Sequence, residues 1–325
     1  MKAIVQDAYG SADVLELREI DQPSPGDGEV LVQVRAASAD PGVWHMMTGV
    51  PYLMRVIGFG FRRPKVPVRG LALSGVVVAS SPGATRFQPG DEVFGTCRSG
   101  SFAEYAVARQ DRLAAKPAAL TFEQAAALPV SALTALQAVR DQAKVQSGQR
   151  VMITGAGGGI GTFAVQLAKA RGASVTGVCG PAKADLVRSI GADTVIDYTR
   201  QEIDGEDKRY DVIIDISGSR PLSVLRRALA PRGVLVLTGG DRYDRPVIAG
   251  MGRQTRAPFL SLFTGQQLRT FIARESAEDY QTLAQLAESG AITPVIDRTY
   301  PLAGAADAIR QIASGHATGK AIITI

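Results

Sequence analysis

The stretch VMITGAGGGIG, residues Val151–Gly161, decides the fold. Its first four residues are typical of a buried strand, and a glycine-rich turn follows them. The next segment is predicted to be a helix, because its apolar residues recur at spacings of three and four: Ile160, Phe163, Ala164, Leu167 and Ala168. Such a turn lets a phosphate approach the backbone, and the free N–H groups and the helix dipole favour negative charge. The stretch predicts a dinucleotide site that includes Gly157; the alternative is a purely structural turn.

The residues after this helix favour NADP(H) over NAD(H). Ser174–Cys179 is predicted as a second strand, which completes a strand–helix–strand unit. In NAD enzymes a carboxylate at the end of that strand usually holds the ribose hydroxyls. Here the strand ends in Cys179, no acid follows directly, and Lys183 comes next. We therefore interpret Cys179 and Lys183 as cofactor-binding residues; the alternative for Lys183 is a solvated cation at a helix start.

Length and charge narrow the class of protein. With 325 residues the chain can bury two cores, and its 46% hydrophobic and 21% charged residues are ordinary for a globular protein. The formal charge of +5 does not indicate nucleic-acid binding, because 36 basic residues are interspersed with 31 acidic ones. The N-terminal residues are not typical of a secretory signal, and no apolar run has the pattern of a membrane span. A cytoplasmic protein with no membrane and no nucleic-acid partner is expected.

The order of predicted elements indicates two domains. The first 120 residues contain short strands broken by glycine and proline, which is typical of a partly closed β-barrel. Thr121 and Gln124 have the spacing of a capping box. Strands and helices then alternate to about residue 240, which indicates a doubly wound parallel sheet. A further helix is expected over Ser276–Ser289, and the strand-forming tail KAIITI (320–325) is expected to return to the first domain.

Six segments in this order resemble the medium-chain dehydrogenase/reductase superfamily, in its zinc-free quinone oxidoreductase branch. They are FQPGDEVFG (87–95), SFAEYAV (101–107), LPVSALTALQAV (128–139), GAGGGIG (155–161), LVRSIGADTVIDY (186–198) and GHATGKAIITI (315–325). The segment MTGVPYLMRVIGFGFRRPK (47–65) resembles bacterial relatives of the reticulon-interacting mitochondrial reductase. The resemblance implies an α/β protein with a GroES-like β-barrel catalytic domain (1–121 and 291–325) and a Rossmann NADP(H)-binding domain (122–290).

The resemblance also implies cofactor residues. Gly158, Gly159 and Ile160 match the positions that cradle the pyrophosphate, and the family's glycine pattern accommodates Ile160. Lys183 and Tyr198 match positions that contact the 2′-phosphate of NADPH. Residues expected near the ribose and nicotinamide are Thr134, Ser217, Gly239, Gly240 and Phe263. Alternatives from the residues alone are a strand-end aromatic for Tyr198 and a core side chain for Phe263.

No metal site is expected. Zinc-dependent relatives carry a Gly-His-Glu turn, whereas this chain has Gly70-Leu71-Ala72, and leucine and alanine supply no donor atoms. Two distant cysteines, Cys97 and Cys179, cannot form a four-cysteine zinc site. Without such a Lewis acid, hydride delivery from NADPH to a quinone or an α,β-unsaturated carbonyl is favoured over alcohol oxidation.

Two residues are candidates on the acceptor side. Tyr52 matches a substrate-side tyrosine of the family and could donate a proton to the developing oxyanion. A packed loop aromatic is the alternative for Tyr52, and solvent is the alternative proton source. Asp40 lies in Ser38-Ala39-Asp40-Pro41, where many relatives have asparagine beside the nicotinamide. Ala72 is a second departure, since many relatives have aspartate there.

The favoured function is therefore a zinc-independent, NADPH-dependent reductase of quinones or enones. Two alternatives stay open: an enoyl or ketone reductase of a specialised metabolite, and a nucleotide-binding sensor or structural protein with little turnover. Family analogy further predicts a homodimer formed through the edge strand of the cofactor sheet, near residues 269–273 (RTFIA).

Overall fold

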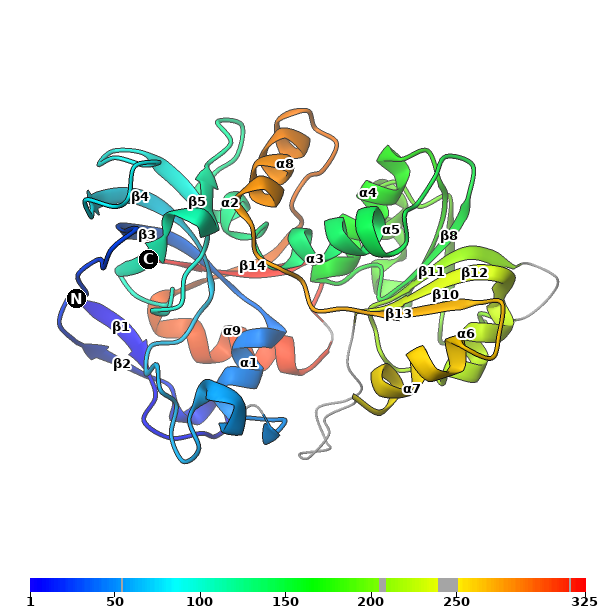
Figure 1. Ribbon diagram of the computed structural model, residues 1–325, viewed down its shortest axis with the longest axis horizontal. Helices are drawn as coiled ribbons and strands as arrows, with labels where there is room; N and C mark the ends of the chain where they lie inside the picture. The colour runs from blue at the N-terminus through cyan, green and yellow to red at the C-terminus, as the bar shows by residue number, and fades with distance from the viewer. Residues whose placement is uncertain (54, 205–208, 239–250, 316) are drawn as a thin grey trace. The chain divides into compact units, whose positions relative to one another are not determined.

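The computed structural model describes residues 1–53, 55–204, 209–238, 251–315 and 317–325. The chain forms two compact units (Figure 1): unit 1 is Met1–Leu133 with Arg274–Ile325, and unit 2 is Thr134–Ala273. Sequence analysis places the domain boundaries at 121/122 and 290/291. Helix α8 (Ala277–Glu288) is part of unit 1, because its Tyr280 is fully buried against Phe94 and its hydroxyl shares a 3.2 Å hydrogen bond with the Thr96 hydroxyl.

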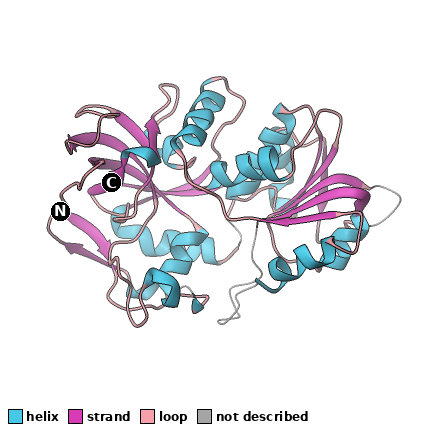
Figure 2. Cartoon of the chain, in the orientation of Figure 1, coloured by secondary structure: helices cyan, strands magenta, loops and turns pink. Residues whose placement is uncertain are grey.

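Unit 2 is a six-stranded parallel sheet with helices on both faces (Figure 2). Its strands are β8 (Arg150–Thr154), β9 (Ser174–Cys179), β10 (Thr194–Asp197), β11 (Tyr210–Asp215), β12 (Leu229–Leu237) and β13 (Gln267–Thr270). Its helices are α4 (Gly159–Ala170), α5 (Ala184–Ser189), α6 (Leu222–Ala228) and α7 (Met251–Ser261). The strand order β10-β9-β8-β11-β12-β13 is the 3-2-1-4-5-6 order of a Rossmann sheet, which confirms the predicted fold class.

Burial explains why the deciding stretch folds as predicted. Val151, Met152 and Ile153 of β8 are completely buried, as expected for the central strand of a sheet covered on both faces. Helix α4 packs through the predicted apolar stripe, including Phe163 and Leu167, whereas Ile160 in its first turn is only half-buried. The turn between them is therefore fixed by a buried strand on one side and a packed helix on the other.

Unit 1 is built on a seven-stranded sheet in the order β14-β15-β3-β4-β5-β7, with β6 also paired to β3, and a separate β1–β2 pair. Its strands are β1 (Lys2–Val5), β2 (Glu16–Glu19), β3 (Glu29–Ala39), β4 (Ala72–Ser80), β5 (Glu92–Thr96), β6 (Tyr105–Arg109), β7 (Leu113–Ala115), β14 (Ile296–Pro301) and β15 (Lys320–Thr324). Its other helices are α1 (Pro41–Thr48), α2 (Phe122–Ala126) and α9 (Ala305–Ala313), and α3 (Ser131–Gln137) continues into unit 2.

Local predictions in unit 1 are confirmed, with one omission. The Thr121 side chain accepts a hydrogen bond from the Gln124 N–H, and the Gln124 side chain returns one to Thr121, so the capping box is present. The tail strand β15 pairs antiparallel with β3, with Ala321 opposite Ala39. Strand β2 was not predicted, because its sequence ELRE has one apolar residue and no alternating pattern.

The described part of the chain contains no helix that is both long and apolar enough to cross a bilayer.

Candidate functional site

The glycine turn lies at the C-terminal end of β8, and at some of its positions the backbone leaves no room for larger residues. Gly155 has a φ of +68°, a left-handed conformation that favours glycine. A methyl group on Gly161 would lie 2.1 Å from the Gly155 carbonyl oxygen, so the turn and the first helical turn touch directly. Gly158 is the N-cap of α4 and its first N–H groups receive no side-chain cap. These residues fit a dinucleotide pyrophosphate, which such a backbone cradle binds.

Lys183 lies directly against this turn. A methyl group on Gly157 would lie 2.9 Å from both Cβ and Cδ of Lys183, so the aliphatic stem of the lysine covers the glycine. Burial raises the pKa of the Cys179 thiol, and the charge of Lys183 lowers it. The Lys183 ammonium therefore lies near Cys179, at the end of β9. Tyr198 is half-exposed, and its hydroxyl lies 3.4 Å from the place of a Gly180 methyl. Four predicted residues, Gly157, Cys179, Lys183 and Tyr198, therefore gather at one edge of the sheet.

The strand order reverses between the parallel neighbours β8 and β11, and a polar network lies at their C-terminal ends. The Thr154 hydroxyl at the end of β8 donates a 2.6 Å hydrogen bond to Asp215 at the end of β11. The Ser217 hydroxyl donates to Thr154 Oγ1 at 3.2 Å, and Arg253 of α7 forms an ion pair with the fully buried Asp215. Ligands of open α/β sheets bind at this switch point.

Sequence analysis named Ser217 but missed Thr154, Asp215 and Arg253. Thr154 and Asp215 could have been noticed in the sequence, because each is a polar residue at the end of an apolar strand. A polar side chain in such a place usually has a hydrogen-bond partner.

The other predicted cofactor residues differ in how far they are buried. Thr134 is the first residue of unit 2 and lies half-buried on α3. Phe263 follows α7 and is 85% exposed, which excludes the alternative that it is a core side chain. Gly239 and Gly240 lie outside the described residues.

On unit 1, Asp40 belongs to a buried polar cluster. It lies between β3 and α1 and forms an ion pair with Lys320 of β15; the exposed fractions of the two side chains are 1% and 3%. The Ser38 hydroxyl donates to Asp40 Oδ2 at 2.6 Å, and the Ser131 hydroxyl donates to Oδ1 at 3.3 Å. Lys320 also donates to Ser131 Oγ at 3.0 Å. Both carboxylate oxygens are therefore engaged, and Lys320 and Ser131 are partners that sequence analysis did not name.

Tyr52, also in unit 1, is more exposed than Asp40. Its side chain is 46% exposed, and the Arg55 guanidinium lies over its ring, 4.6 Å from the ring centre. The same guanidinium lies 4.3 Å from the ring centre of Tyr9. The ring is thus held by a cation–π contact while the residue stays partly open to solvent.

Comparison with known proteins finds one family match within unit 1 and one that spans parts of both units. Residues 26–118 match the alcohol dehydrogenase GroES-like domain family, and residues 190–323 match the zinc-binding dehydrogenase family. A chloroplastic quinone-oxidoreductase homolog from Spinacia oleracea is 34% identical, over 99% of this chain and 98% of that protein.

The chain belongs to the quinone oxidoreductase branch of the medium-chain dehydrogenase/reductase superfamily.

Two further similarities agree with this assignment. The mitochondrial NAD(P)H oxidoreductase RTN4IP1 from Mus musculus is 33% identical, over 100% of this chain and 89% of that protein. The structure of a mycobacterial protein complexed with NADPH superimposes with a TM-score of 0.85 at 25% identity and full coverage of both chains. As a member of this branch, the protein is an NAD(P)H oxidoreductase of the quinone oxidoreductase type.

Although one matching family is described as zinc-binding, this quinone oxidoreductase lacks the donors of a zinc site in the parts that the structure covers. No three His, Cys, Asp or Glu side chains gather there closely enough to hold a metal ion. The His45 Nδ1–H donates a 2.7 Å hydrogen bond to the Val50 carbonyl oxygen, and burial lowers the pKa of the imidazole. Cys97 is buried, which raises its pKa to about 11. His316 lies outside the described residues.

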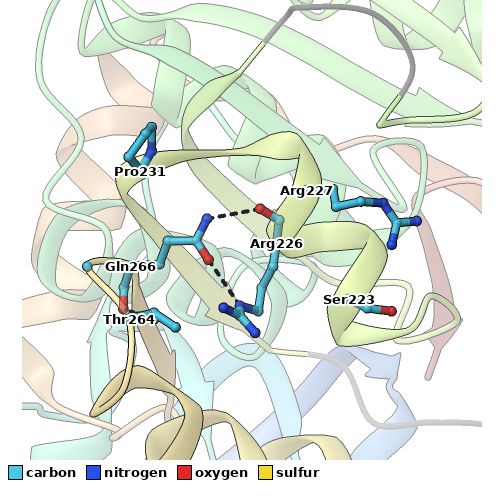
Figure 3. Close-up of a pocket in the computed structure, with 7 residues that line it drawn as sticks. Ser223, Arg226, Arg227, Pro231, Thr264 and Gln266 are labelled. Carbon is cyan, nitrogen blue, oxygen red and sulfur yellow. Dashed lines mark hydrogen bonds between the residues drawn. The ribbon is translucent and has the colours of Figure 1, made fainter.

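A hollow of about 420 Å³ on unit 2 is separate from this site (Figure 3). Its walls include Arg226 on α6, Pro231 in β12 and Gln266 just before β13. Gln266 accepts a hydrogen bond from Arg226 Nε at 3.1 Å and donates one to the Arg226 carbonyl at 2.9 Å. The hollow adjoins the N-terminal ends of the strands, whereas the glycine turn lies at their C-terminal ends. The family's cofactor belongs at the C-terminal edge, so the hollow is not its site.

Proposed function

We propose that this quinone oxidoreductase is an NADPH-dependent, zinc-independent reductase that transfers hydride to a quinone or an α,β-unsaturated carbonyl. The observation that carries the proposal is the position of Lys183 against the glycine turn at the C-terminal edge of the sheet. When NADPH is bound, its nicotinamide supplies the hydride. The residues of the chain bind and orient the two reactants and supply hydrogen bonds.

Charge supports NADPH over NADH. Strand β9 ends at Cys179 and Gly180 follows it, so no carboxylate stands where one would hold a ribose and repel a 2′-phosphate. The neighbouring Asp197 is turned to Thr199: its Oδ1 accepts bonds from the Thr199 N–H at 2.9 Å and hydroxyl at 2.8 Å, which lower its pKa. Lys183 with Tyr198 would then contact the 2′-phosphate, while Gly158, Gly159 and Ile160 would hold the pyrophosphate.

The other cofactor residues are proposed from the family pattern. Thr134, Ser217 and Phe263, together with Gly239 and Gly240, would lie near the ribose and nicotinamide. For Ser217 the proposal is supported by its place at the switch point, bonded to Thr154.

The proposed chemistry follows from the donors that the chain has. Quinones and enones delocalise the incoming electron pair onto their own oxygen, so they need a hydrogen-bond donor rather than a metal ion. Tyr52 is the proposed donor, because its phenol is half-exposed and its ring is held by Arg55. Solvent is the alternative proton source. Asp40 is proposed to act beside the acceptor by positioning the start of α1, since Lys320, Ser38 and Ser131 already engage its carboxylate.

Turnover on a panel of acceptors tests the proposal. Purified protein treated with a chelator is given NADPH or NADH with each of several quinones, enones, ketones and enoyl thioesters, and nucleotide oxidation is followed by absorbance. We expect oxidation that prefers NADPH and is fastest with quinones or enones. Activity confined to enoyl thioesters or ketones would favour the metabolite-reductase alternative. NADPH binding without oxidation by any acceptor would favour a sensor or structural role and contradict the proposal.

A further inference from the structure

The segment after α1 presents apolar side chains to solvent. It comprises Leu53 and residues 55–65, includes the short helical turn Arg55–Phe59, and is the blue segment that follows α1 in Figure 1. Leu53, Val56 and Phe61 are 55%, 69% and 71% exposed, and Phe59 is 39% exposed. We call this group the apolar tip. Exposed apolar side chains that cluster in one short segment mark an interaction site more often than single ones do.

Specific contacts hold the inner side of this segment, so the exposure of the tip is built into the fold. Arg55 donates from Nε to the Gly49 carbonyl and from Nη2 to the Thr48 carbonyl, both at 2.9 Å. The Tyr9 hydroxyl donates to the carbonyls of Phe59 at 2.9 Å and Gly60 at 2.7 Å. The backbone of the segment is anchored to unit 1 at these points, and the tip residues lie on its outer side.

The charged residues that follow the tip in the sequence are all basic. Arg62, Arg63 and Lys65 are exposed, and among the described residues none of them forms an ion pair. The sequence has no aspartate or glutamate between Asp40 and Asp91. Asp7, which feels the charge of Arg63, is paired with Arg18. Apolar side chains beside unpaired cations are the composition of segments that lie in the interface of an anionic bilayer.

We propose that this segment, Leu53 with residues 55–65, is a peripheral docking surface for an anionic lipid bilayer, with the apolar tip in the headgroup region and Arg62, Arg63 and Lys65 on the lipid phosphates. A second copy of the chain fits less well, because a two-fold contact would bring like charges together. Sequence analysis expected no membrane partner because it found no spanning segment; an interfacial segment needs none. If the proposed function holds, this docking would bring the reductase to quinones dissolved in the bilayer.

Vesicle flotation of the full-length protein tests the proposal without NADPH or acceptor, so that its outcome is independent of the proposed function. Vesicles are made of phosphatidylcholine alone or with added phosphatidylglycerol. We expect the protein to float with the anionic vesicles, and less so at high salt. The double variant Leu53→Ser/Phe61→Ser should bind both kinds at least about tenfold more weakly, because it removes buried apolar area. Arg62→Gln/Arg63→Gln should lower binding to anionic vesicles by about tenfold and leave binding to neutral ones unchanged.

Leu17→Ser is the matched control, because Leu17 is 45% exposed in unit 1 but its one neighbouring cation, Arg18, is paired with Asp7 and Glu16. Its binding should equal that of the unchanged protein. Absence of flotation with anionic vesicles would overturn the proposal, as would flotation that the two double variants do not reduce. Light scattering of the same variants completes the test. A lower mass for Leu53→Ser/Phe61→Ser than for the unchanged protein would show that a second copy covers the apolar tip, and this result would also overturn the proposal.

Discussion

Lys183 is the side chain on which the proposed nucleotide preference depends most. Its stem covers Gly157 and its charge reaches Cys179 at the end of β9. We expect Lys183→Ala to weaken NADPH binding by about 10- to 100-fold, the value of a charge-assisted hydrogen bond, with little effect on NADH. Fluorescence titration with both nucleotides measures the difference. Equal losses for NADPH and NADH would mean that the lysine supports the turn and does not contact the 2′-phosphate.

The pair of Asp40 and Lys320 makes a second prediction at the residue scale. Asp40→Asn leaves the Lys320 ammonium buried without its counter-charge, which should lower the free energy of unfolding by about 3 kcal/mol. The double variant Asp40→Asn/Lys320→Met should recover most of that loss. Urea unfolding followed by the fluorescence of Trp44, the single tryptophan, reports on this unit directly. An Asp40→Asn protein as stable as the original would show that the ion pair is not maintained in solution.

Lys183 and Asp40 also show which site residues can be predicted from the sequence. The position of Lys183 beside the glycine turn could be predicted, because it follows from a local pattern, a strand end without an acid followed by a cation; its role toward the 2′-phosphate stays a prediction. Asp40 was noticed only as a departure from the family. Its partner Lys320 was missed, because the two residues meet through the pairing of β15 with β3, and the register between strands so distant in sequence cannot be predicted from periodicity.

At the scale of elements, the turn between β8 and α4 has the tightest steric requirement of the site. Gly161→Ala would place a methyl group 2.1 Å from the Gly155 oxygen, and we expect a loss of about 1–3 kcal/mol in stability together with loss of NADPH binding. Gly158→Ala is the matched control: its φ of −94° is open to any residue, and its methyl would lie 3.4 Å from the same oxygen.

The two variants separate folding from binding. Gly158→Ala should melt near the temperature of the original protein and bind NADPH more weakly, because the methyl group occupies space meant for the phosphate. Thermal melting by circular dichroism and nucleotide titration measure both effects. If Gly161→Ala melted like the original protein, the close contact within the turn would not exist as described.

Helices and strands with a strong pattern of apolar residues could be predicted from the sequence, and those without such a pattern could not. The strand–turn–helix of β8 and α4 and the capping box at Thr121 follow from patterns a few residues long. Strand β2 has no such pattern: three of its four residues are charged, and it exists because β1 pairs with it. The polar network of Asp215 and Arg253 needs two elements brought together by the fold, so only its strand-end residues were visible in the sequence.

At the scale of the whole molecule, the outer edge of unit 2 supports the proposal of a homodimer. Strand β13 ends the sheet, and Ile272, which follows it, is 89% exposed. Phe259, Leu262 and Phe263 at the end of α7 are also more than two-thirds exposed. Strand β13 itself, QLRT, is mostly polar, so a second copy would pair with its free backbone edge and cover the apolar side chains beside it.

We therefore expect light scattering to give twice the 34.2 kDa mass of one chain. Ile272→Lys should reduce that mass to one chain, because two like charges would meet at the edge. Leu17→Lys, an exposed site elsewhere, should leave it unchanged. A monomeric original protein at micromolar concentration would contradict the proposed dimer.

The central claim, hydride transfer from NADPH to an activated acceptor, is tested most directly by isotope transfer. NADPH carrying deuterium at C4 of the nicotinamide, in each of its two configurations, is oxidised by the protein with an enone, and the product is analysed by mass spectrometry and NMR. The account predicts that one of the two cofactors delivers its deuterium to the β-carbon of the saturated ketone. NADPH oxidation that leaves the product unlabelled with both cofactors, or no product at all, would contradict it.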